Sequence, residues 1–181
     1  MSGTAAAASR EVTRRFLVRF LLAASVLLTV YYYPYDTRGL AAALIHRYLS
    51  VYAHLAGIAI SVFDPSVRVG GNHIQGRMSL EFALSCDGMD VLLLFAAAAF
   101  AFPASWRSRA VGVGVMFASL VVVNLVRIVS LYFIGVYAPA TFGFFHIEVW
   151  PLAIVVLAAA GFFAWTRLVL RRRARDVALE A

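Results

Sequence analysis

Long apolar segments occupy most of the chain, and they constrain its fold more than any other feature of the sequence. A helix of about 20 apolar residues crosses the hydrocarbon core of a bilayer, which is about 30 Å thick. The apolar segments run over residues 16–33, 40–63, 89–102, 111–137 and 147–170. Since 63% of the 181 residues are hydrophobic and only 14% are charged, too few polar side chains remain to cover a soluble domain. The sequence therefore predicts an all-α polytopic membrane protein with a single membrane-embedded domain over residues 1–181.

The basic residues are all arginine, and their positions indicate how the chain is oriented in the membrane. Most of them lie before residue 20, in the short loop 105–109 and from Arg167 onwards. Because cytoplasmic loops carry an excess of basic residues, we expect both termini and this loop on the cytoplasmic side of the inner membrane. Residues 1–12 are expected to form a disordered stub and residues 167–181 a basic cytoplasmic tail. The net charge of +7 is thereby explained without nucleic acid, whose binding would require basic and aromatic residues interleaved on one face.

Two cytoplasmic termini require an even number of crossings, so one of the five apolar segments must not cross. We expect the exception to be segment 40–63, which carries His46, Arg47, Ser50, His54 and Ser61. This amphipathic pattern predicts an interfacial or re-entrant helix on the outer side and leaves about four transmembrane helices. The alternative is a complete crossing of this segment, with one terminus on the opposite side.

A small β-hairpin is expected outside the membrane between residues 66 and 82. Apolar and polar residues alternate on either side of Gly70-Gly71-Asn72, which supplies a turn.

Three residues whose chemistry is complementary are expected at one depth in this arrangement. Cys86 and Arg127 each lie about twenty residues from the turn at residues 106–107. Two antiparallel helices of about 30 Å would therefore bring both residues to the outer side of the membrane. Arg127 and His146 flank a second turn on that side. This turn is marked by Gly135, Pro139 and Gly143.

Each of the three residues also has a structural interpretation when it is taken alone. A lone cysteine is usually a small core residue, but Cys86 precedes the helix expected from Met89, whose dipole favours the thiolate. Arg127 lies in an apolar helix, where a guanidinium is costly unless it is paired, hydrated or snorkelling. His146 by itself is more often structural. Together they suit a thiolate that attacks a peptide carbonyl, a guanidinium that stabilises the oxyanion and an imidazole that protonates the leaving amine.

Three further polar residues lie close to these in the sequence. Asn124 is three residues before Arg127, on the same helical face, and is placed to orient it. Asp90 is placed to pair with Arg127 or His146, and Asp87 to cap the helix that follows it.

Three blocks of the sequence resemble the signature of the exosortase/archaeosortase family. They are Cys86-Asp87-Gly88, Asn124-Leu125-Val126-Arg127-Ile128 and Phe145-His146. Residues 102–107 and 130–137 are most similar to the short exosortase H subtype, and the resemblance covers roughly residues 80–166. Members of the family more often carry Ser or Asn after the cysteine, so Asp87 is a mild departure from the pattern.

The resemblance implies a membrane cysteine protease or transpeptidase with an extracytoplasmic active site. Its substrates would be exported proteins that end in a sorting motif, a transmembrane helix and a basic cluster. Cleavage would pass through a thioester on Cys86, with Arg127 as the partner of the carbonyl or oxyanion and His146 as the acid and base. The new C-terminus would then be transferred to an unknown cell-surface acceptor, and no metal or organic cofactor is implied.

Other functions are less consistent with the sequence. An aspartic peptidase of the lipoprotein-signal-peptidase type needs carboxylates on two helices, whereas Asp87 and Asp90 share one turn. Haem ligation by His46 and His54 fails because eight residues place them off one helical face. The remaining alternative is a non-enzymatic membrane assembly factor or small transporter, in which Asp90 and Arg127 form a structural ion pair.

Overall fold

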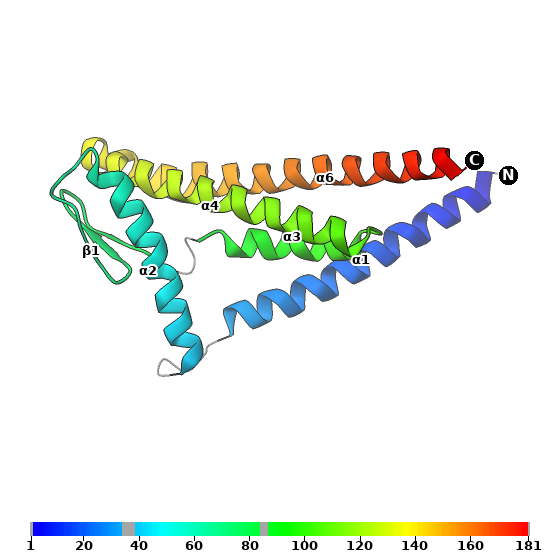
Figure 1. The fold of residues 1–181 in the computed structure, drawn as a ribbon, viewed down its shortest axis with the longest axis horizontal. Coiled ribbons are helices and arrows are strands. Elements are labelled where there is room, and N and C mark those ends of the chain that lie inside the picture. Colours follow the sequence, from blue (N-terminus) through cyan, green and yellow to red (C-terminus); the bar gives the residue numbers. More distant parts are fainter. Residues whose placement is uncertain (1, 34–38, 84–86, 181) are drawn as a thin grey trace. The chain divides into compact units, whose positions relative to one another are not determined.

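The computed structural model describes residues 2–33, 39–83 and 87–180, and most of them are helical (Figure 1). The longer helices are α1 (Ser2–Tyr32), α2 (Leu40–Ser61), α3 (Met89–Ala101), α4 (Trp106–Tyr137) and α6 (Trp150–Glu180). Between α4 and α6 lie a 3₁₀ turn (Pro139–Thr141), α5 (Phe142–Phe144) and a π-helix (Phe145–Val149). The strands are β1 (Arg68–Gly70), β2 (His73–Gln75) and β3 (Leu80–Glu81). The predicted all-α membrane fold with one small β element is confirmed.

Four helical stretches in the described chain are long and apolar enough to cross a membrane: Arg10–Tyr32, Ala42–Ser61, Trp106–Tyr137 and Pro139–Asp176. Their number agrees with the prediction, but their identity differs. α2, which we expected to lie at the interface, has 22 residues, whereas α3, which we expected to cross, has 13. At about 1.5 Å per residue, α3 measures only about 20 Å, less than the hydrocarbon thickness. By length and composition, α2 is therefore a candidate for a complete crossing, and α3 is not.

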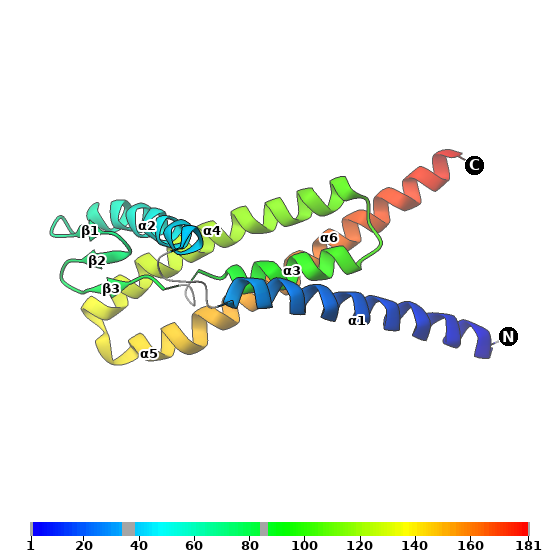
Figure 2. The ribbon, with the colours of Figure 1, turned by 90° about the horizontal axis from the view of Figure 1, so that it is seen from below.

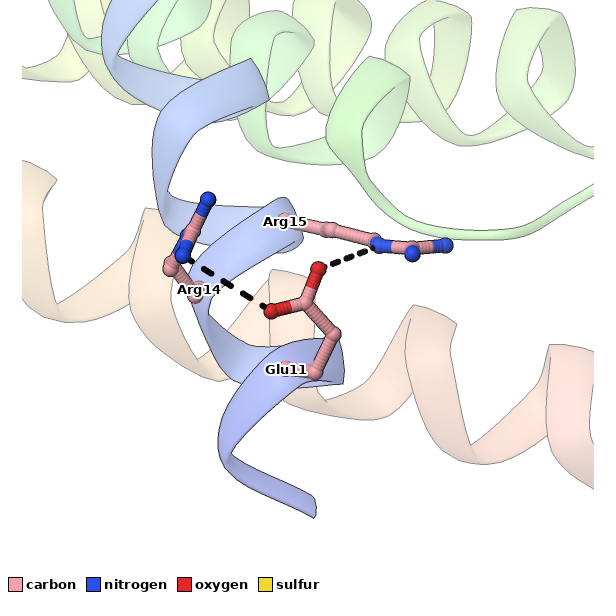
Figure 3. A network of polar contacts seen from close by, with 3 residues as sticks. All are labelled: Glu11, Arg14 and Arg15. Carbon is pink, nitrogen blue, oxygen red and sulfur yellow. Dashed lines mark hydrogen bonds and ion pairs between the residues drawn. The ribbon is translucent and has the colours of Figure 1, made fainter. Parts of the chain in front are cut away.

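Residues 1–12 were expected to be a disordered stub, but α1 begins at Ser2. The physical reason is the run Ala5–Ala8, since alanine has the highest helix propensity of all residues. One turn later, Glu11 accepts a hydrogen bond from Arg15 at 2.8 Å and lies 3.9 Å from Arg14 (Figure 3). These pairs are exposed and contribute little individually, but their spacing of three and four residues favours the helix.

The described chain forms two compact units. The first contains residues 2–33, 90–117 and 156–180, and the second contains residues 39–83, 87–89 and 118–155. Trp165 is the centre of the first unit, with its ring 5.7–6.4 Å from those of Phe95, Phe102 and Phe162. Its Nε1–H donates to the carbonyl of Ser108 at 3.0 Å. Gly112 permits this close approach, because any Cβ there would collide with the Trp165 ring.

The second unit contains a three-stranded antiparallel sheet in the order β1-β2-β3 (Figure 2). The predicted hairpin is present, but it is tighter than expected. Gly71 adopts a φ of 61°, which favours glycine, and the chain reverses at once so that Val69 pairs with Ile74. Leu80, in the alternating segment that we expected to form the second strand, pairs with Ile74 from the other side. The strand that the sequence did not predict is β2, which lies between the two expected ones.

α2 covers this sheet and supplies much of the core of the second unit. It packs against β1 and β2, and Gly57 admits the side chain of Val69 where a Cβ would collide. Its buried face carries small residues such as Ala53 and Ala56, whereas Val51 and Ile58 are exposed. The exposed apolar side chains are the ones that lipid would cover in a membrane.

A hydrogen-bonded cluster joins the segment after α2 to α4 within this unit. The Tyr132 hydroxyl donates to the Asp64 carboxylate at 2.6 Å, and both side chains are buried. Asp64 also accepts bonds from the hydroxyl of Ser66 at 2.6 Å and from its N–H at 3.1 Å. Tyr132 in turn accepts the N–H of Arg77 at 3.0 Å. The sheet is thereby fixed to the helix that carries Arg127.

We expect Tyr132→Phe to lower the Tm of the detergent-solubilised protein by about 3–10 °C, because a buried carboxylate loses its phenolic donor. Thermal unfolding followed by intrinsic fluorescence measures the change. Tyr137→Phe is the control, since Tyr137 is an exposed residue of the same helix whose hydroxyl bonds only exposed Arg77 in the described chain. Equal shifts in the two variants would contradict a special role for the Asp64 bond.

The same cluster predicts that the stabilising effect of the Tyr132 hydroxyl depends on pH. Hydrogen bonds from Ser66 and Tyr132 hold the pKa of the Asp64 carboxyl below its ordinary value. A carboxyl with a lowered folded-state pKa stabilises the protein above its unfolded pKa, and this contribution is lost as the pH falls through the folded pKa. The difference in Tm between the wild type and Tyr132→Phe should therefore narrow in the acid range.

Candidate active site

Arg127 lies in the second half of α4 and is almost completely enclosed. Only 6% of its surface is exposed, although it is flanked by apolar residues such as Val126 and Ile128. A guanidinium in this position is costly, because a charge inside an apolar region must be compensated by partners or water. Such residues in membrane proteins usually have a functional role.

His146 lies in the π-helix Phe145–Val149, a type of helix that occurs frequently at functional sites. Its ring stacks on that of Phe142, with the centroids 5.6 Å apart and the planes 14° from parallel. The buried Nδ1 atom of His146 has no hydrogen-bond partner among the described residues. Because buried polar atoms are nearly always satisfied, this nitrogen is available for a substrate or for a group outside the described chain.

The two residues meet at one cavity of about 180 Å³. Its remaining lining is formed by Leu80, Glu81, Phe82, Ile128, Leu131 and Phe142. β3, α4 and the segment before α6 thus each contribute a wall, and the lining combines apolar side chains with a guanidinium, an imidazole and a carboxylate. Arg127 and His146, predicted to meet from their places about a turn, are brought together here.

Cys86 lies outside the described residues, and the described chain resumes at Asp87. The backbone carbonyl of Asp87 accepts a hydrogen bond from the Asn124 side chain at 3.2 Å. Asn124 is 1% exposed and lies one helical turn before Arg127. The chain next to Cys86 is therefore joined to α4 close to the guanidinium.

The other carboxylates have local roles. Asp87 caps the start of α3, since its side chain accepts the N–H of Met89 at 2.8 Å, and Gly88 between them has a φ of 70°. Asp90 accepts the N–H of Val91 at 2.8 Å. Its pairing with Arg127 or His146 stays a prediction.

Among the cavity-lining residues that sequence reasoning did not single out, Glu81 and Phe142 are the ones closest to the chemistry of the site. Glu81 comes from β3 and is exposed, with an oxygen 4.0 Å from Nε2 of His73. Phe142 stacks on the His146 ring. The spacing of Phe142, four residues before His146, was the available signal, because residues four apart share a helical face.

Comparison with protein-family models identifies a match to transmembrane exosortases (Exosortase_EpsH) over residues 12–164. The chain belongs to the transmembrane exosortase family. No curated protein and no solved structure matches it.

Family membership and the four apolar helical stretches make this exosortase a multi-pass membrane protein. All three of the sequence blocks that resemble the family fall inside the matched region. Two of them supply Arg127 and His146 to the cavity, and the third begins with Cys86.

Proposed function

We propose that this exosortase is a cysteine protease or transpeptidase that cleaves C-terminal sorting signals of exported proteins. The observation that carries the proposal is the shared cavity of Arg127 and His146, 19 residues apart in the sequence, in a member of the exosortase family. The substrate ends in a sorting motif, a transmembrane helix and a basic cluster. At about 180 Å³ the cavity is smaller than most small-molecule sites, which suits a short portion of an extended peptide.

Cys86 provides the nucleophile. Its thiol gives a proton to His146, and the thiolate attacks the carbonyl carbon of the scissile peptide bond. Arg127 stabilises the negative charge that develops on the carbonyl oxygen. When the tetrahedral intermediate collapses, the C–N bond breaks and His146 returns the proton to the leaving amine.

The second half of the reaction regenerates the thiol. A nucleophile of the cell-surface acceptor attacks the thioester, His146 takes its proton, and the bond between carbon and sulfur breaks. The sulfur leaves as a thiolate and regains a proton from His146. Asn124 supports both halves by holding the carbonyl of Asp87, the residue next to the nucleophile. No metal or organic cofactor takes part in this scheme.

The proposal includes a topology. Both termini face the cytoplasm, and the site lies at the extracytoplasmic side of the inner membrane. The arginines near the N-terminus, in the loop 105–109 and after Arg167 support this orientation through the positive-inside rule.

The chain offers a direct test, because Cys86 is its only cysteine. In cells that express the wild type, sequencing of protein C-termini should show exported proteins shortened at their sorting signals. Mass spectrometry should also detect a thioester adduct that hydroxylamine releases. Both signals should disappear in Cys86→Ala and persist in Ser85→Ala, which changes the preceding residue and keeps the thiol.

Identical C-termini in the wild type and in Cys86→Ala would overturn the proposal. That result would favour the non-enzymatic assembly factor or transporter. Cleaved termini without transfer to another molecule would restrict the activity to hydrolysis and would leave the thioester mechanism intact.

A further inference from the structure

The first unit contains a second and larger cavity, none of whose lining residues belongs to the candidate active site. It has a volume of about 850 Å³, within the range of about 300–1,000 Å³ that is common for ligand sites. It lies between the beginning of α4 and the last turns of α6. Its polar lining consists of Ser105, Arg107, Ser108, Arg172, Arg173 and Asp176.

The charges around this cavity are not balanced within the described chain. Three guanidinium groups and one carboxylate line it. None of the three arginines forms an ion pair among the residues described, even with Asp176, three and four positions away on α6. The cavity therefore has an excess of positive charge, for which an anionic ligand is the natural counterion.

The start of α4 adds uncharged donors to the same place. The Ser105 hydroxyl accepts the N–H of Ser108 at 3.3 Å, and the Ser105 carbonyl accepts the N–H of Arg109 at 3.0 Å. The N–H groups of Trp106 and Arg107 have no partner in the described part of the chain. First-turn N–H groups and the helix dipole favour a bound anion such as phosphate.

The walls of the cavity are held in place without a ligand. The Arg109 guanidinium donates to the carbonyl of Phe102 at 3.1 Å and lies over the rings of Phe100 and Trp106. The hydrogen bond from Trp165 to the carbonyl of Ser108 also fixes the first turn of α4. A preformed site loses less conformational entropy on binding than a mobile one.

The rest of the lining is apolar, including Ala104, Ala110, Val111 and Val169. Beside it, Trp106 is an exposed aromatic residue at a helix end, the position that tryptophan favours at the membrane–water interface. Apolar walls would not contribute to the binding of a free phosphate ion. A phospholipid, in contrast, presents a phosphate and acyl chains together. Basic pockets between transmembrane helices on the cytoplasmic side are known to bind anionic lipid headgroups.

We propose that this cavity binds the headgroup of an anionic phospholipid, with Arg107, Arg172 and Arg173 around its phosphate. The lipid is bound where α4 begins and α6 ends, on the side that we expect to face the cytoplasm.

The test compares two double variants that remove the same charge from opposite faces of one helix. Arg172→Gln with Arg173→Gln changes the lining of the cavity. Arg171→Gln with Arg175→Gln is the matched control, because at about 100° per residue those two arginines point away from the cavity face. The delipidated full-length protein is titrated with a fluorescent short-chain phosphatidylglycerol, and phosphatidylcholine and inorganic phosphate are used as competitors.

We expect phosphatidylglycerol to bind and phosphatidylcholine to compete poorly. The cavity variant should lose affinity by about tenfold or more, and the control variant by less than about twofold. Asp176→Asn should tighten binding, because it removes the only carboxylate of the lining. An equal loss of affinity in both double variants would show that the lipid responds to the overall surface charge and not to this cavity, and it would overturn the proposal. Inorganic phosphate that competes as well as the unlabelled lipid would overturn the assignment to a lipid.

Discussion

Replacing Arg127 by lysine should lower the rate of thioester formation on Cys86 by about 10²–10³-fold, the loss expected when one oxyanion donor is removed. Lysine keeps the positive charge, so this variant isolates the geometry of the guanidinium. The planar fork of arginine presents two parallel donors to an oxygen, and the lysine ammonium cannot reproduce that arrangement. Single-turnover formation of the adduct, followed by mass spectrometry of the reconstituted protein, measures the rate.

Two controls separate chemistry from folding. Arg68→Lys makes the same change at an exposed arginine whose side chain, among the described residues, bonds only the nearby carbonyls of Pro65 and Val67. It should leave the rate unchanged within about twofold. Thermal unfolding of Arg127→Lys should stay close to that of the wild type, because the charge remains. Full activity in Arg127→Lys would show that a positive charge is sufficient at this position and that the geometry of the guanidinium is not required.

The second large effect is expected at His146. His146→Ala should slow both halves of the reaction by about 10²–10⁴-fold, because no other imidazole lines the cavity in the described chain. The truncation also leaves a space beside the Phe142 ring that free imidazole can fill. Added imidazole should therefore restore part of the activity.

His54→Ala is the matched control for this experiment. His54 is an exposed residue of α2 whose Nδ1 lies 2.7 Å from the carbonyl of Ser50. Its removal should change neither the rate nor the response to imidazole. If imidazole fails to rescue His146→Ala while the Tm of the variant falls sharply, the histidine stabilises the fold and another group transfers the proton.

The helices were largely predictable, because their boundaries follow the apolar pattern. Segment 40–63 corresponds to α2 (Leu40–Ser61), and segment 111–137 ends with α4 at Tyr137. The predictions failed at the ends and lengths of helices, which hydropathy alone does not determine. The polar, alanine-rich beginning of α1 is helical, and α3 is shorter than the apolar segment needed for a crossing.

The candidate site was predictable only in part. The meeting of Arg127 and His146 followed from a reversal of the chain between two helices, which spacing can predict. Gly135 was assigned to that turn, but it lies within α4, where any Cβ would collide with Met78. The alternating residues Met78, Leu80 and Phe82 predicted a strand at β3, but they could not predict that it pairs with β2 or that it lines the cavity, because strand pairing depends on contacts distant in the sequence.

The π-helix around His146 allows this segment to hold one residue more than an ordinary helical turn. Loss of a single residue from Phe145–Val149 would allow an α-helical turn to form, and the residues on either side would keep their rotational phase. Ile154, the side chain nearest to Gly88, would therefore stay in place, as would Phe142. The change would fall on the turn itself, where the side chain of His146 would be displaced. Over evolutionary time a one-residue deletion here should therefore yield a protein that still folds but has lost its activity.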